Sequence, residues 1–187
     1  MLDYNAKFNT GLLYHDFLAK FGSDEQRRRW EVVHEKVALT DVQKALLTGF
    51  KREMKVLCLT GAWCGDCVNQ CPIFEHFAIA CPRIHIRYFD RDANPDLVAA
   101  LSICGGMRVP VVLFLSEDGH QVGWYGDRTL SKYRRMAADQ LGAACPTGLV
   151  PDERDLLAAV TQDWLNEFER VELILRTSAR LRKLHGD

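Results

Sequence analysis

At 187 residues the chain is long enough to bury roughly 70% of the surface that its unfolded form exposes, so its core needs no disulfide or metal. Its 24 basic and 25 acidic residues leave a formal net charge of −1, which gives no support to charge-driven binding of nucleic acid or an anionic membrane. We therefore expect proteins or small molecules as partners, with no nucleic acid and no membrane.

The N-terminal sequence has no basic region followed by an apolar run, and no stretch of about eighteen apolar residues occurs. These features predict a cytoplasmic protein. The seven cysteines are odd in number and irregular in spacing, which disfavours the disulfide framework of a secreted domain. In a reducing compartment clustered cysteines are more often catalytic or metal-binding, so the segment 58–71 is the main candidate for a functional site.

Residues 1–54 are predicted to form a helical N-terminal extension. Between residues 12 and 50 the apolar side chains recur at helical spacing, which fits two or three helices. A hydroxyl residue stands immediately before Asp24 and before Asp41, each with a glutamine three positions after the hydroxyl, so helices are expected to begin there. The basic run 27–29 has acidic neighbours on both sides and is interpreted as a solvated helix face.

Residues 55–142 are predicted to form an α/β domain with the element order β-α-β-α-β-β-α. Two strands joined by a crossover helix lie parallel and the last two strands form a hairpin, which gives a mixed sheet. The signals, in order, are the run "KVLCLT", helical spacing after Cys67, the alternating "IHIRYFDRD", a helix entry at Asn94-Pro95, two strands around the turn Glu117-Asp118-Gly119, and a helix ending at Gly142.

Residues 143–187 are predicted to form a loop and a C-terminal helix packed on the domain. From Asp152 to Leu184 the apolar residues follow a wide stripe, which fits one long amphipathic helix or two shorter ones. Such a stripe must be buried against the domain or against another chain.

The segment "LTGAWCGDCVNQCPIF" holds three cysteines whose uses include a redox pair, a metal site or packing. The strand-to-helix turn places Cys64 at a helix N-terminus, where unpaired N–H groups favour a thiolate and lower the pKa of a thiol. Cys67 lies three residues further on, within disulfide range. Cys64 is thus the predicted exposed nucleophile and Cys67 the more buried resolving thiol of a dithiol exchange.

Three segments together resemble the thioredoxin family: "AWCGDCVNQCP", "FDRDANPDLVAALSICGGMRVPVVLFLSEDG" and "VGWYG". In that family a Trp precedes the first cysteine, a Pro follows the second cysteine, and a cis-proline precedes a strand beside the active site. Trp63, Pro72 and Pro110 stand at these places. The likeness covers about Lys55 to Leu141 and implies a thioredoxin-like fold, a central mixed β-sheet flanked by helices. The added N-terminal helices and long C-terminal helix resemble a bacterial branch with a Trp-Cys-Gly-Asp-Cys motif.

The resemblance implies a set of supporting residues. It implies that Val109-Pro110 is cis, that the residue before this proline offers backbone hydrogen bonds to an extended substrate, and that a shallow apolar surface binds the substrate. The residues expected to support the active site are Trp63, Gly65, Asp66, Val109 and Pro110. Those expected to bind substrate are Trp63, Met107, Arg108, Val109 and Pro110.

Three residues depart from the family pattern. Cys58 stands where many thioredoxins have a buried Asp that helps to move the proton of the resolving thiol. Asp66 replaces the usual Pro between the cysteines, and its charge is expected to raise the pKa of Cys64 somewhat or to act as a local proton acceptor. Cys71 shares a helix face with Cys67, but a helical i, i+4 pair does not easily meet disulfide geometry, so we interpret Cys71 as packing.

The other cysteines are interpreted as structural. Cys58, Cys81 and Cys104 are expected to be small core or loop residues, and Cys145 an exposed loop residue. A zinc site would need further ligands, for which Cys71 with His76 is the alternative, but no second Cys-x-x-Cys occurs. We therefore assign no metal and no cofactor beyond a redox-active Cys64–Cys67 disulfide.

Two functions remain open at this point. One is a thioredoxin-like thiol–disulfide oxidoreductase that reduces disulfides in client proteins through Cys64 and Cys67. Its electrons would come from a reductase or a low-molecular-weight thiol. The other is a protein-interaction or redox-sensing module without turnover, in which the helical extensions bind the partner.

Overall fold

The computed structural model describes residues 2–187 and contains a four-stranded mixed sheet with the strand order β2-β1-β3-β4. The strands are β1 (Met54–Thr60), β2 (Ile84–Asp90), β3 (Val111–Ser116) and β4 (Gln121–Gly126). β1 pairs parallel with β2 and antiparallel with β3, and β3 and β4 form a hairpin. The element order predicted from residue 55 onward is confirmed.

The two central strands are covered on both faces. Every residue of β3 is buried, as is every residue of β1 except the half-buried Lys55. This is why both strands read as continuous apolar runs without a clear alternation. The register places Cys58 of β1 between Tyr88 of β2 and Val112 of β3. The predicted hairpin turn is present, and Gly119 in it has a φ of 85°, a conformation that glycine adopts at little cost.

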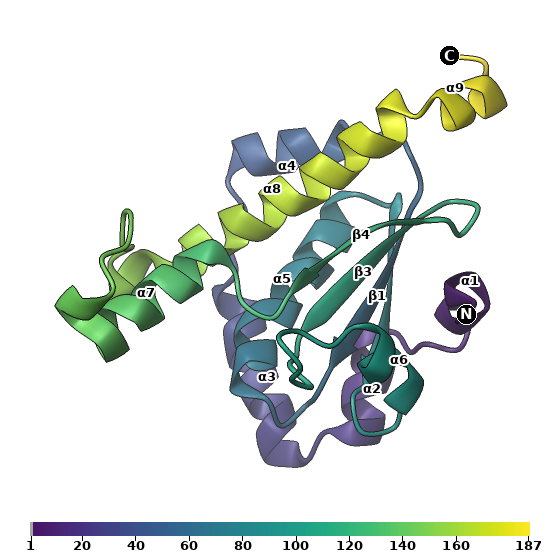
Figure 1. Cartoon of the computed structure of the whole chain (residues 1–187). Coiled ribbons are helices and arrows are strands. Elements are labelled where there is room, and N and C mark those ends of the chain that lie inside the picture. The colour runs from purple at the N-terminus through teal and green to yellow at the C-terminus, as the bar shows by residue number, and fades with distance from the viewer. Residues whose placement is uncertain (1) are drawn as a thin grey trace.

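Helices α5 (Gly65–Ala80) and α8 (Leu156–Thr177) pack together against the sheet (Figure 1). The Phe168 ring of α8 contacts rings of α5 and β3, with centroid distances of 5.9 Å to Phe74, 5.2 Å to Phe77 and 5.1 Å to Phe114. Aromatic contacts of this kind bury large apolar areas and fix the position of one element on another. The C-terminal helix is therefore part of the core that holds α5.

The described part of the N-terminal segment, residues 2–53, forms four helices, α1 (Tyr4–Phe8), α2 (Tyr14–Phe21), α3 (Asp24–Lys36) and α4 (Asp41–Thr48). α3 and α4 begin where predicted, and both have a complete capping box. α1 was not predicted, because five residues are too few for a periodic apolar pattern. The three helices between residues 12 and 50 agree with the expected two or three.

Helix α2 packs on β2 at the edge of the sheet. The Tyr88 ring of β2 lies 5.6 Å from the Tyr14 ring and 6.0 Å from the Phe17 ring, centroid to centroid. Leu12 also forms an isolated antiparallel bridge with Tyr88, with backbone hydrogen bonds of 3.1 and 2.8 Å. The edge of β2 is therefore partly covered by the chain's own N-terminal segment.

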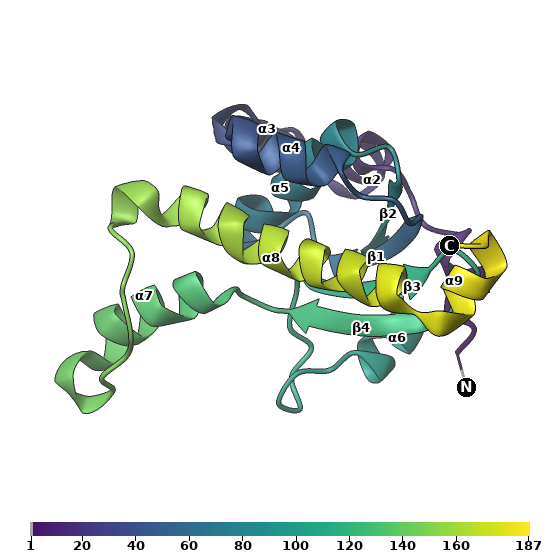
Figure 2. The same ribbon diagram turned by 90° about the horizontal axis from the view of Figure 1, so that it is seen from above.

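The remaining helices are α6 (Pro95–Ala100), α7 (Leu130–Leu141) and α9 (Ala179–His185). α6 begins at the predicted Asn-Pro entry, and α7 ends at Gly142 as predicted. The predicted C-terminal helix is two helices, because the backbone is extended at Ser178, whose hydroxyl caps α9. Figure 2 shows α8 crossing the molecule, with α7 standing out near one end and α9 at the other.

The buried apolar side chains form one cluster that includes residues of the N-terminal helices, the sheet, α5 and α8. The boundaries proposed at residues 54 and 142 remain predictions. Within residues 2–187, no helix is long and apolar enough to cross a membrane.

Candidate active site

Cys64 is the N-cap residue of α5, and Cys67 lies in the first turn of that helix. Cys64 is partly exposed, whereas Cys67 is fully buried, with 0% of its surface accessible. The neighbouring Trp63 is 41% exposed. The structure therefore places the two thiols in the arrangement expected of an attacking and a resolving cysteine.

The pKa of Cys64 differs in direction from the sequence-based expectation. The hydrogen bond with Cys67, partial burial and the charge on Cys67 together raise the pKa of the Cys64 thiol above its ordinary value. The backbone N–H groups of Cys67 and Asp66 act in the predicted, lowering direction, but the neighbouring thiol and burial outweigh them. Burial is also the main reason why the pKa of Cys67 is raised well above its ordinary value.

The Val109–Pro110 peptide bond is cis, as the resemblance implies. The Cys64 thiol donates a hydrogen bond to the backbone carbonyl of Val109, with an S···O distance of 3.6 Å. Val109 and Pro110 themselves are buried, while Met107 is 64% exposed and Arg108 is also exposed. Of the expected substrate-binding residues, Trp63, Met107 and Arg108 offer the accessible side chains.

The surface beside Cys64 is more polar than the shallow apolar surface that was expected. A hollow of about 440 Å³ is lined by charged residues as well as apolar ones, namely Trp63, Cys64, Asp66, Arg91, Met107, Arg108, Val109, Asp127, Arg128 and Met136. The Arg91 guanidinium lies over the Trp63 ring at 4.4 Å from its centroid, which is cation–π geometry. The rim thus combines aromatic, thioether and guanidinium groups.

An ion-pair network joins Asp66 to the segment after β4. Arg128 pairs with the Asp66 carboxylate at 2.5 Å and with the Asp127 carboxylate at 2.9 Å. Asp127 also accepts hydrogen bonds from Arg108, at 3.2 Å, and from the Tyr133 hydroxyl. Although burial alone would raise it, these bonds hold the pKa of Asp127 below its ordinary value. The charge of Asp66 therefore does not stand unpaired beside the thiols.

Sequence reasoning missed this network. Asp127 and Arg128 directly follow the "VGWYG" segment, but nothing in their spacing relates them to Asp66, and only the end of β4 beside α5 brings them together. The Gly126–Asp127 peptide bond is cis as well. An acidic and a basic residue next to each other at the end of a predicted strand were the only available signal.

Gln70 links the cysteine helix to α8. Its side-chain amide donates to the backbone carbonyls of Asp66, at 3.2 Å, and of Asp127, at 3.0 Å. Its amide oxygen accepts from the Trp164 indole N–H at 2.9 Å. Gln70 and Trp164 are both buried, so each polar atom in this chain of contacts requires its partner. The C-terminal helix is thereby tied to the first turn of α5.

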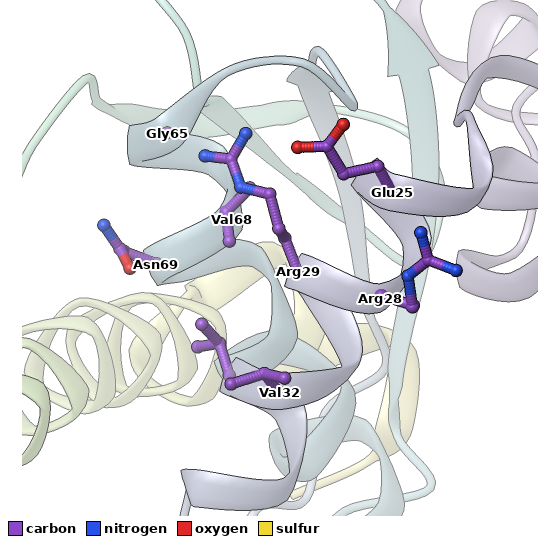
Figure 3. Close-up of a pocket in the computed structure, with 8 residues that line it drawn as sticks. Glu25, Arg28, Arg29, Val32, Gly65, Val68 and Asn69 are labelled. Carbon is purple, nitrogen blue, oxygen red and sulfur yellow. The ribbon is translucent and has the colours of Figure 1, made fainter.

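The N-terminal helices also reach the site. The Trp30 indole of α3 donates to the carbonyl of Ala62 at 2.9 Å, two residues before Cys64. A second hollow, of about 390 Å³, lies between α3 and the start of α5, and Figure 3 shows its residues. Arg28 and Arg29 on its rim are exposed, in agreement with a solvated helix face.

Beneath the pair lies a buried group of sulfur and hydroxyl side chains. Cys58 of β1 and Cys71 of α5 are both 0% exposed, and their sulfur atoms lie 3.7 Å apart. The Thr60 hydroxyl lies 3.4 Å from the Cys71 sulfur. All seven cysteines are free thiols. The position usual for a buried Asp is therefore occupied by a thiol that touches a second thiol.

The remaining cysteines are spread over the molecule. Cys81 is buried, Cys104 is an exposed loop residue, and Cys145 is half-buried where full exposure was expected. The His76 ring interacts with the backbone carbonyl of His34 at 3.0 Å. Within residues 2–187, no group of three or more His, Cys, Asp and Glu side chains is arranged to hold a metal ion.

A mixed sheet whose crossover helix begins at a Cys-x-x-Cys pair, opposite a cis-proline, defines a thioredoxin-like α/β protein. A thioredoxin family model matches residues 13–139, more than half of the chain, and the protein belongs to this family. The match includes most of the N-terminal helical segment as well as the sheet. Among curated proteins no significant sequence match was found.

Several solved structures are similar to the chain. A Pseudomonas aeruginosa protein of unknown function is 17% identical with a TM-score of 0.69, and the match covers 91% of this chain and 97% of that one. An HIV epitope-scaffold is 19% identical with a TM-score of 0.65, with coverage of 95% and 100%. A Fasciola hepatica thioredoxin is 25% identical over 51% of this chain and 88% of its own, with a TM-score of 0.36. Family membership supports a redox-type role in general terms.

Proposed function

We propose that the protein is a thiol–disulfide oxidoreductase that reduces disulfides in client proteins through Cys64 and Cys67. The observation that carries this proposal is the placement of a partly exposed thiol at the N-cap of α5 with a buried thiol one turn below it. The hydrogen bond from Cys64 to the Val109 carbonyl places the first thiol beside the cis-proline segment, where an extended client chain has backbone groups to pair with.

The exchange proceeds in two displacements that balance without a bound cofactor. The Cys64 thiolate attacks one sulfur of the client disulfide, and the other client sulfur leaves and takes up a proton. Cys67 then loses its proton and attacks the Cys64 sulfur, which releases the second client thiol. Two electrons and two protons pass to the client, and a Cys64–Cys67 disulfide remains. A reductase or a low-molecular-weight thiol then restores the dithiol.

The surroundings of Cys64 suit a client chain that carries a negatively charged side chain close to its disulfide. Trp63 and Met107 offer apolar contact, while Arg91 and Arg108 offer hydrogen-bond donors at the rim.

The raised pKa of Cys64 keeps most of the thiol protonated at neutral pH, so the exchange rate should rise with pH. We place this activity in the cytoplasm, where thiols are kept reduced.

The test is the reduction of insulin followed by turbidity, with dithiothreitol as the electron source. The wild-type protein should accelerate precipitation, and Cys64→Ser should return the rate to that of dithiothreitol alone, because no thiol remains at the exposed position. Cys104→Ser, which removes an exposed loop thiol, should match the wild type. Rates for both wild type and Cys64→Ser that do not exceed that of dithiothreitol alone would instead favour an interaction or redox-sensing module without turnover.

A further inference from the structure

Four thiols form a series that runs from the surface into the core. Cys64 is partly exposed, and the three below it, Cys67, Cys71 and Cys58, each have 0% of their surface accessible. Cys67 lies in the first turn of α5, three residues after Cys64 and one turn before Cys71, and the Cys71 sulfur lies 3.7 Å from that of Cys58. The four thiols therefore follow one another along α5 and across to β1.

We propose that Cys58 and Cys71 form a second, internal disulfide, and that they receive their oxidising equivalent from the Cys64–Cys67 disulfide. The inference rests on the proposed function, since that activity generates the Cys64–Cys67 disulfide. A small apolar core residue would fill either position, but only two thiols in contact allow a bond between strand β1 and helix α5.

The transfer takes two displacements, and no external oxidant is needed beyond the active-site disulfide. The Cys71 sulfur loses its proton and attacks the Cys67 sulfur, which breaks the Cys64–Cys67 bond, and Cys64 takes up a proton. Cys58 then loses its proton and attacks the Cys71 sulfur, which breaks the Cys67–Cys71 bond, and Cys67 takes up a proton. The Cys58–Cys71 pair is oxidised by two electrons, and the Cys64–Cys67 pair is reduced by two.

Geometry favours Cys58–Cys71 as the end point of this transfer. Cys67 and Cys71 are i and i+4 of one helix, a spacing that fits disulfide geometry poorly and makes a bond between them strained and easily exchanged. Cys58 and Cys71 come from different elements, 13 positions apart in the sequence, and their sulfurs already touch. The Thr60 hydroxyl, 3.4 Å from the Cys71 sulfur, is placed to donate to the thiolate that the first step requires.

Burial makes this transfer slow and keeps it internal. Cys58 and Cys71 have no surface that water or a bulky thiol can reach, so exchange with them has to come from another thiol of the protein. Burial raises the pKa of both thiols, which lowers the thiolate fraction available for attack. The consequence is a protein that stores one disulfide in its core while its exposed pair returns to the dithiol form, ready for one more client.

The experiment follows the disulfides by peptide mapping of the whole protein. The reduced, desalted chain receives one molar equivalent of diamide under nitrogen, and samples taken over time are quenched in acid and alkylated with N-ethylmaleimide. Digestion after Trp63 and before Asp66 separates Cys58 and Cys64 from a peptide that carries both Cys67 and Cys71. Fragmentation in the mass spectrometer then assigns each linkage.

The expected result is a Cys64–Cys67 linkage that forms first and declines as a Cys58–Cys71 linkage appears, with the total constant at about one bond per chain. A second equivalent of diamide should give both linkages in one molecule. A Cys64–Cys67 linkage that persists, with no linkage to Cys58 after either addition, would overturn the inference and leave the proposed function intact. Absence of the Cys64–Cys67 linkage itself would overturn both.

Variants check the assignment independently. Cys71→Ala should abolish linkage of Cys58 while it retains the Cys64–Cys67 linkage, and Cys104→Ser should behave as wild type. Circular dichroism and thermal melting of Cys71→Ala show whether its fold is intact, and the wild-type map decides the proposal whatever they show. A Cys58 peptide linked to Cys67 in the wild type would contradict the assignment.

Discussion

Arg128 determines the charge that surrounds the cysteine pair. Asp66 lies between the two cysteines in sequence, and an unpaired carboxylate there would disfavour a thiolate. The Arg128 guanidinium pairs with it at 2.5 Å, and Asp127 fixes the other side of that guanidinium at 2.9 Å. The side chain of Asp66 is thus directed into an ion pair, while its backbone N–H acts to lower the pKa of Cys64.

Removal of the guanidinium should slow the exchange. In Arg128→Gln the Asp66 carboxylate loses its partner, so the pKa of Cys64, already raised, should rise further. The thiolate fraction at pH 7 should fall, and the rate of Cys64 alkylation by iodoacetamide should drop by about 3- to 10-fold, since an uncompensated carboxylate nearby disfavours the thiolate by about 1 kcal/mol. The rate–pH profile, measured from pH 6 to 10, should shift to higher pH.

The double variant Asp66→Asn/Arg128→Gln provides the control. With both charges removed, the profile should return close to that of the wild type, because no uncompensated carboxylate remains. Arg135→Gln, which alters an exposed ion pair on α7, should leave the profile unchanged. A profile for Arg128→Gln that overlays the wild type would show that Asp66 has no influence on the thiols.

The pair itself could be predicted from the sequence, and its surroundings could not. The spacing of Cys64 and Cys67, the apolar strand before them and the proline at 110 carry the prediction of an exposed and a buried thiol. The prediction that the helix N-terminus lowers the pKa of Cys64 was wrong. Burial and the neighbouring Cys67 raise this pKa, and both depend on how the first turn packs. Arg128 was missed, because an ion pair between distant segments leaves no periodic signal.

Helix α5 is held at its first turn from both ends of the chain. Trp30 of α3 bonds to the carbonyl of Ala62, and Trp164 of α8 bonds to Gln70. Gln70 in turn donates to the backbone carbonyls of Asp66 and Asp127, so hydrogen bonds connect α8 to the turn that contains the two thiols. The helical additions thereby position the dithiol as well as extend the core.

Loss of the Trp164 donor should destabilise the protein. In Trp164→Phe the buried Gln70 oxygen loses its partner and the core loses volume, so the free energy of unfolding should fall by about 2–4 kcal/mol. Urea denaturation followed by circular dichroism measures this change. Leu173→Ala on the same helix, at a side chain that is 55% exposed, should change it by about 0.5 kcal/mol or less. Equal effects of the two substitutions would contradict the proposed role of Trp164.

Element starts were predictable where a local rule applied. Three helix starts that the structure shows follow from capping residues before Asp24 and Asp41 and from the Asn-Pro pair at the start of α6. Asp3 and Ser178 also cap the helices that follow them, but α1 and α9 have only five and seven residues, too few for a periodic apolar pattern. The sequence predicted only that Cys58 and Cys71 each pack in the core. Their contact could not be predicted, because it depends on how α5 lies over β1.

At the scale of the whole molecule, the additions at both ends share one core with the sheet. Glu172 of α8 accepts hydrogen bonds from the backbone N–H groups of Lys51 at 2.7 Å and Arg52 at 3.3 Å, just before β1. The Pseudomonas aeruginosa protein matches over 91% of the chain, so the same fold extends through both additions. The cysteine pair is carried by the central helix of this enlarged domain.

Capture of a client on Cys64 tests the central claim most directly. In Cys67→Ser the first displacement can occur but the second cannot, so incubation with insulin should accumulate a mixed disulfide that dithiothreitol releases. Peptide mapping should place the bond on Cys64, and Cys64→Ser/Cys67→Ser should form no adduct. If Cys67→Ser forms no adduct, or forms it equally on Cys104, then Cys64 is not the attacking thiol and the proposed reduction of client disulfides is contradicted.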